Sequence, residues 1–247
     1  MNTLRGLSVP AGATVTISAI SASGALTAGG GEYSAGIGGS ASGNVVYASG
    51  GNITILSGTV DARGGENAAG IGGASNGAGT GKGESICISG GKVTATGGSD
   101  GAGIGGGRSS YGAGTGQNGK ITIEGNAIVT ATGGSHGAGI GGGYGANGTG
   151  EGGKITLGGA ANVTASSVYG AGIGSGETIS DGVYGTGQSG EVLITENVTV
   201  KVSSRLGAGI GGGVPANYGS YGTGKDGRLT INGNALVSAQ ELTPSLK

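Results

Sequence analysis

The tetrapeptide Ala-Gly-Ile-Gly recurs six times at a nearly constant interval, and this repeat restricts the fold more than any other feature. Its isoleucines fall at positions 37, 71, 104, 140, 173 and 210, so successive copies are 34, 33, 36, 33 and 37 residues apart. Self-similarity with a period of about 20–50 residues is typical of solenoids and other repeat architectures. We therefore expect a single repeat domain over residues 1–240, followed by a tail at 241–247.

Two further strings accompany the tetrapeptide, and each alternates apolar with polar residues. One is represented by NITI, SICI, KITI, KITL, EVLI and RLTI, which begin at residues 52, 85, 120, 154, 191 and 228. The other follows it, for example as KVTATGG (92–98) and IVTATGG (128–134). Alternation with a period of two predicts β-strands whose successive side chains face opposite sides.

Three short strands per interval, separated by Gly and Asn turns, predict an all-β fold, the parallel β-helix or β-solenoid. We expect about seven coils of roughly 34 residues, with a glycine-rich variable loop in each. The first coil is degenerate, and the last lacks its AGIG string. Helices are excluded because glycine, at 68 of 247 residues, costs about 1 kcal/mol relative to alanine in a helix. The fold predicts two inward columns, one of Ile53, Ile86, Ile121 and Ile155, the other of Val60, Val93, Val129 and Val163.

The glycines around each isoleucine predict a wall with almost no outer side chains. In GAGIGGG (137–143), we expect Ala138 and Ile140 to point inward and the glycines to face outward. Glycine permits positive φ and lets another backbone approach closely. We expect the following segment to cover this face; a second chain, or no cover, are the alternatives. GTG recurs in that segment and predicts a column of Thr80, Thr115, Thr149, Thr186 and Thr223.

Composition excludes several classes of protein. Collagen needs abundant proline, and there are 3 prolines here. The formal charge is −1, with 12 scattered Lys and Arg residues, so we predict no nucleic-acid partner. Without an apolar run of about 18 residues, we predict no membrane insertion, and no signal peptide is evident in this segment. Cys87 is the only cysteine, and we predict no disulfide, metal or cofactor.

Motifs that suggest enzymatic chemistry lack the required context. GAGIGG (101–106) matches the dinucleotide pattern, but it recurs in coil after coil and no helix follows it. GTGQNGKI (114–121) has Ile after its lysine, where a P-loop requires Ser or Thr. The 13 acidic residues are scattered and show no pair at matching positions. We therefore expect no enzymatic activity.

Tyrosines are the most informative residues for binding, because all eight lie outside the three repeated strings. Six are in the variable segments after AGIG, whereas Tyr33 and Tyr169 occupy the corner just before it. His136, the only histidine, has that corner position one coil from Asp100. A tyrosine offers a flat apolar ring and a hydroxyl, which suit a sugar or a protein contact. The candidate ligand-binding residues are Tyr111, Tyr144, Tyr169, Tyr184, Tyr218, Tyr221 and His136.

Two alternatives remain for these residues. The tyrosine rings could merely cover the glycine-rich side of the solenoid. His136 is expected to be a solvated corner side chain, and a general base near Asp100 is the alternative.

The combination GGKVTATGGSDGAGIGGG…GTGQNGKITI (90–123) resembles glycine-rich repeats of large secreted or wall-anchored, adhesin-like proteins of Gram-positive gut and soil bacteria. The resemblance covers about residues 12–239. It implies an extracellular bacterial setting, secreted or associated with the cell wall. Such regions are stalks, adhesin segments or carbohydrate-binding modules.

We therefore predict a non-enzymatic module for adhesion or carbohydrate binding, with a glycan or a host or cell-surface protein as its partner. Self-association, end to end or side by side, is a further expectation. The alternatives are, in order, a structural spacer or fibre segment of a cell surface or phage, a polysaccharide-active β-helix enzyme, and an ice-binding protein. Ice binding is suggested by the outward threonine pairs of TAT at 94–96 and 130–132.

Overall fold

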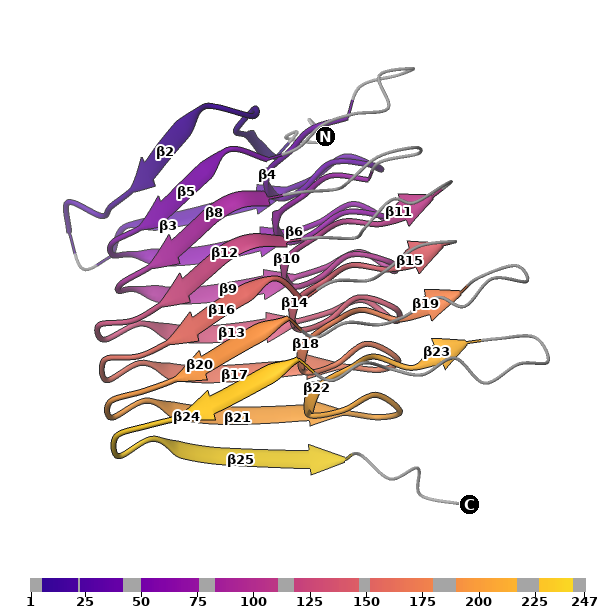
Figure 1. Cartoon of the computed structure of the whole chain (residues 1–247). Coiled ribbons are helices and arrows are strands. Elements are labelled where there is room, and N and C mark those ends of the chain that lie inside the picture. Colours follow the sequence, from indigo (N-terminus) through magenta and orange to yellow (C-terminus); the bar gives the residue numbers. More distant parts are fainter. Residues whose placement is uncertain are drawn as a thin grey trace, which may run out of the picture.

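The protein is a stack of short β-strands that run parallel to one another around a common axis (Figure 1). The computed structural model describes residues 6–21, 23–41, 50–75, 83–110, 118–146, 152–179, 190–216 and 227–241. Three sheets contain seven strands each, and a fourth contains four. The prediction of a parallel β-solenoid with three strands per coil is therefore confirmed. In the described part of the chain, no helix is long and apolar enough to span a membrane.

The chain visits the sheets in the same order in every coil. Sheet 1 consists of two-residue strands, namely β1 (Leu7–Ser8), β4 (Ile37–Gly38), β7 (Ile71–Gly72), β10 (Ile104–Gly105), β14 (Ile140–Gly141), β18 (Ile173–Gly174) and β22 (Ile210–Gly211). Sheet 2 contains β2 (Thr14–Ile17), β5 (Asn52–Ile55), β8 (Gly83–Ile88), β12 (Asn118–Ile123), β16 (Lys154–Leu157), β20 (Glu191–Ile194) and β24 (Arg228–Ile231). Sheet 3 contains β3 (Ala25–Gly29), β6 (Thr59–Arg63), β9 (Lys92–Thr96), β13 (Ile128–Thr132), β17 (Asn162–Ser167), β21 (Thr199–Ser204) and β25 (Leu236–Glu241). Sheet 4 lies between sheets 1 and 2 in chain order and contains β11 (Ser109–Ser110), β15 (Gly145–Ala146), β19 (Thr178–Ile179) and β23 (Pro215–Ala216).

The first strand of sheet 1 was not evident in the sequence. Leu7 pairs with Ile37 and Ser8 with Gly38, although this segment lacks the AGIG string. Each coil therefore begins at sheet 1 and ends at sheet 3. The seven strands of sheet 1 are therefore β1, from the start of the chain, and the six strands of the AGIG strings.

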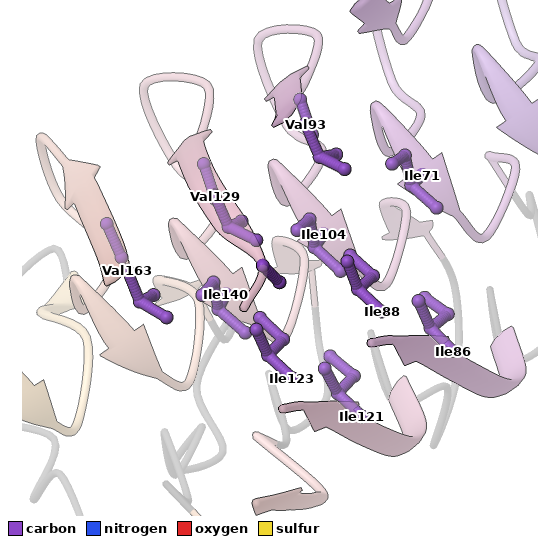
Figure 2. Close-up of a cluster of buried hydrophobic side chains, with 14 of the residues drawn as sticks. Ile71, Ile86, Ile88, Val93, Ile104, Ile121, Ile123, Val129, Ile140 and Val163 are labelled. Atoms are coloured by element: carbon purple, nitrogen blue, oxygen red, sulfur yellow. The ribbon is translucent and has the colours of Figure 1, made fainter. Parts of the chain in front are cut away.

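The core consists of apolar columns in register from coil to coil (Figure 2). Ile104 pairs with both Ile71 and Ile140 in sheet 1, and all three side chains are fully buried. The two predicted columns are also confirmed, since Ile53, Ile86, Ile121 and Ile155 pair in sheet 2, and Val60, Val93, Val129 and Val163 pair in sheet 3. Burying each side chain of this size contributes roughly 1.5–3 kcal/mol. The columns therefore bind one coil to the next.

The glycines of the AGIG string face protein rather than solvent, so the predicted bare face is wrong. A Cβ atom on Gly139 would lie 2.7 Å from the backbone nitrogen of Ser166 and 2.6 Å from the carbonyl oxygen of Gly172. At this glycine the cover is the end of β17 in the next passage of sheet 3, together with the carbonyl of Gly172. Most of the segment that was predicted to cover the face lies outside the described residues. Ala138 and Ile140 are buried, as predicted. The predicted threonine column lies outside the described residues.

The glycine after each isoleucine has a conformation that other residues rarely adopt. Its φ lies between 129° and 139° in all six copies, at Gly38, Gly72, Gly105, Gly141, Gly174 and Gly211. The chain reverses here, since the backbone N–H of Ala138 donates to the carbonyl of Gly142 at 2.9 Å. A Cβ on Gly141 would lie 1.9 Å from the carbonyl oxygen of Gly174. Both the turn and the coil spacing therefore require glycine.

We expect Gly141→Ala to lower the free energy of unfolding by at least about 2 kcal/mol, because it adds backbone strain and a clash with the next coil. Gly29→Ala is the matched control, since a Cβ there meets nothing within 4 Å, and it should change stability by less than about 0.5 kcal/mol. Urea denaturation measures both. Equal losses in the two variants would contradict this explanation.

Candidate functional site

Two columns of variable side chains run along the solenoid beside sheet 1. The corner column occupies the position just before each glycine-rich turn and comprises Tyr33, Asn67, Asp100, His136, Tyr169 and Leu206. The second column lies eight residues further along the chain, after the turn. From the second turn onward it comprises Ser75, Arg108, Tyr144, Glu177 and Val214. These are the positions where the repeat leaves the side chain free to vary.

Backbone hydrogen bonds interleave the two columns. The N–H of Tyr144 donates to the carbonyl of Asp100, and the N–H of Glu177 donates to the carbonyl of His136, each at 2.8 Å. The N–H groups of Ser75, Arg108 and Val214 bond in the same way to the corner residue one coil earlier. Every second-column side chain is thus held beside the corner of the preceding coil, whatever its identity.

His136 is flanked by carboxylates from both neighbouring coils. A hydrogen bond joins its Nδ1 and Oε2 of Glu177, and its Nε2 lies 3.9 Å from Oδ1 of Asp100. The His136 side chain is 32% exposed, whereas those of Asp100 and Glu177 are 12% and 4% exposed. The imidazole therefore remains accessible while its two acidic neighbours are largely withdrawn from water.

Arg108 completes the polar part of this group. Its guanidinium forms an ion pair with Asp100 at 3.1 Å, and one of its N–H groups donates to Oδ1 of Asn67 at 3.5 Å. Its Cζ also lies 5.6 Å from the centre of the Tyr144 ring, within the range of a cation–π interaction. Arg108 thus balances one of the two carboxylates and contacts an aromatic ring.

Two tyrosine rings pack against His136. The Tyr169 ring stacks on the imidazole with a centroid distance of 5.3 Å and an interplanar angle of 9°. The Tyr144 ring lies at the same distance, tilted by 56°. We call these three residues the aromatic platform, and together with Asp100, Arg108 and Glu177 they form the corner cluster.

Burial raises the pKa of the Glu177 carboxyl above its ordinary value of 4.5. The hydrogen bond from His136 opposes this shift, and the charge of Asp100 adds to it. The result is a carboxyl group that binds a proton more readily than one in water. Among the described residues, no three His, Cys, Asp or Glu side chains are placed to hold a metal ion.

The structure brings three of the predicted site residues together, namely Tyr144, Tyr169 and His136. Tyr33 is at the first corner, where it is exposed and the hydrogen bond with Glu32 raises the pKa of its hydroxyl. The remaining candidates, Tyr111, Tyr184, Tyr218 and Tyr221, lie outside the described residues.

Two expectations about this region need correction. His136 is not simply a solvated corner side chain, because it contacts four side chains. The acidic residues are not all scattered, because Asp100 and Glu177 meet at the same imidazole from different columns. Arg108 and Glu177 were missed as site residues. They could have been found from the constant spacing of eight residues between each corner residue and the second-column residue after the same turn.

Comparison with known proteins supports the fold. A family model described as a beta helix repeat matches residues 53–77, 86–108 and 121–144. Each of these three segments includes one strand of sheet 2, one of sheet 3 and one of sheet 1, in that order. No curated protein and no solved structure matched the chain.

The raised pKa of Glu177 makes stability depend on pH. The stabilisation contributed by this group is complete below its ordinary pKa of 4.5 and is lost as the pH rises through the raised value. Glu177→Gln keeps an acceptor for His136 without a charge, so we expect it to lose less stability than the wild type between about pH 4.5 and about pH 7.5. Urea denaturation at both pH values measures the difference. As a control, Glu191→Gln on sheet 2 should lose as much as the wild type; the same loss in Glu177→Gln would argue against this role.

Proposed function

We propose that the protein is a non-enzymatic binding module whose ligand is a carbohydrate. The observation that carries the proposal is the aromatic platform, in which His136 packs against Tyr144 and Tyr169 on a partly exposed edge of a rigid solenoid. Regular repeats commonly present variable residues on one side as a binding surface.

The chemistry of the corner cluster suits a sugar. Aromatic rings offer flat apolar faces for the C–H side of a pyranose, and tyrosine adds a hydroxyl that can hydrogen-bond. Asp100 and Arg108 border the platform and supply an acceptor and several donors for sugar hydroxyls. Since these two side chains pair with each other, a neutral ligand meets no uncompensated charge from them.

The setting that we propose is extracellular, as the resembling repeats imply. There the module would attach its bearer to a glycan on a host or bacterial surface.

Removing the platform should weaken binding. On a glycan array, we expect the wild type to bind at least one oligosaccharide. The Tyr144→Ala/Tyr169→Ala double variant should bind it about 10-fold more weakly or worse, since two ring contacts together are worth at least about 1.4 kcal/mol. Tyr33→Ala, at an exposed corner of the same column, is the control and should keep wild-type affinity. The proposal fails if the wild type binds no glycan, or if the double variant binds as tightly.

A second candidate, a fibre segment, is favoured by the last coil. Leu229 and Ile231 of β24 are 47% and 48% exposed, whereas their partners in the preceding coil, Val192 and Ile194, are 2% and 0% exposed. Strand β2 in the first coil, Thr-Val-Thr-Ile, also alternates, with Val15 and Ile17 as its apolar residues. A second copy stacked end to end would continue sheet 2 with matching apolar columns. Such stacking is compatible with glycan binding.

Sedimentation velocity over a range of protein concentrations tests the fibre candidate. We expect species larger than the monomer to accumulate as the concentration rises. Leu229→Lys should suppress them by placing a charge in the apolar column, whereas Leu206→Lys, at an exposed corner, should not. A wild type that stays monomeric at every concentration rules this candidate out.

A further inference from the structure

We propose that a proton on His136 regulates the aromatic platform. The imidazolium is held by the carboxylates of Asp100 and Glu177 and fixes the two tyrosine rings, whereas the neutral imidazole loses its attraction to Asp100. The effect on ligand affinity rests on the proposed function, because it requires that the platform is the binding face. The effect on the rings does not.

Elements of three successive coils meet at His136. The residue itself precedes β14, and Tyr144 follows that strand. Asp100 and Arg108 flank β10 in the preceding coil, while Tyr169 and Glu177 flank β18 in the next coil. Five titratable or charged groups surround the imidazole. They are the carboxylates of Asp100 and Glu177, the guanidinium of Arg108, and the phenols of Tyr144 and Tyr169.

The two protonation states of His136 make different contacts with these groups. A neutral imidazole has one N–H, and beside an ionised Glu177, which can only accept, this N–H is at Nδ1. Nε2 then carries a lone pair, which faces Oδ1 of Asp100 at 3.9 Å and is repelled by it. The imidazolium has an N–H on both nitrogens. It therefore attracts both carboxylates at once and ties the three coils together.

With both carboxylates ionised, the charges of the cluster balance when His136 is protonated. With Asp100 and Glu177 ionised and Arg108 positive, a neutral His136 leaves a net charge of −1, and an imidazolium brings the sum to zero. Because Glu177 is 4% exposed and Asp100 12% exposed, water screens these charges less than it screens charges on an open surface.

The aromatic platform responds to the same proton. A cation stacked on a tyrosine ring gains a cation–π attraction that a neutral ring lacks. Protonation therefore strengthens the Tyr169–His136 stack and restricts the imidazole against which Tyr144 also packs. A platform that is already ordered loses less conformational entropy when it binds a ligand. Affinity should thus be higher at the acidic end of the range.

A measurement without ligand tests the effect on the rings. His136 is the only histidine, so the imidazole signals in an NMR titration belong to it without further assignment. We expect the ring signals of Tyr144 and Tyr169 to shift with the same midpoint as the imidazole, and these shifts to vanish in His136→Gln. Tyrosine signals that stay constant while the imidazole titrates would overturn the inference.

The effect on binding is measured with the strongest oligosaccharide from the glycan array. We expect the wild type to bind it about 5-fold more tightly at about pH 5.5 than at about pH 8, a modest coupling of the size common between linked sites. His136→Gln should bind equally at the two pH values, and Leu206→Gln, at a corner outside the cluster, should keep the wild-type ratio.

The two proposals fail in different ways. Equal wild-type affinity at both pH values overturns the regulation and leaves glycan binding intact. No glycan bound at either pH overturns the proposed function, and the NMR titration then decides the regulation of the platform by itself.

Discussion

Close contact between the backbones of successive coils is the constraint on which the rest of the structure depends. At Gly141 the chain turns with a positive φ, and the carbonyl of the next coil occupies the space of a side chain. This contact lets Ile140 reach the core from a strand of two residues. The buried columns then supply the favourable free energy, but they can form only where glycine permits the coils to approach.

The same turn explains how a monotonous repeat acquires a local site. It brings the residues just before and just after it together, and backbone hydrogen bonds then join each pair to the next coil. None of these bonds depends on a side chain. In the middle coils, the variable positions hold a histidine, two tyrosines, two acids and an arginine. The backbone sets where these side chains lie, and the local sequence alone decides which side chains form the corner cluster.

The sequence was sufficient to predict the buried apolar columns but not to predict the corner cluster. Alternating apolar residues in strings such as KITI and KVTAT fixed which side chains face the core, because a strand has only two faces. Strand β1 (Leu7–Ser8) was not predicted, because a two-residue strand without glycines has no distinctive sequence pattern. The prediction that Gly139 faces outward was wrong because β17 packs against this glycine, and the position of β17 depends on the path of the whole coil. The meeting of His136 with Glu177 also depended on that path, since the two residues are 41 positions apart.

Pairing between columns has a consequence for how such a chain changes over evolutionary time. The second-column partner of five corner residues, Tyr33, Asn67, Asp100, His136 and Tyr169, comes from the adjacent coil, as Glu177 does for His136. Gain or loss of one entire coil by recombination would preserve the core, yet it would give the residues on either side of the junction new neighbours. Duplication and deletion are thus a means of reshuffling surface chemistry in this architecture, without any point mutation.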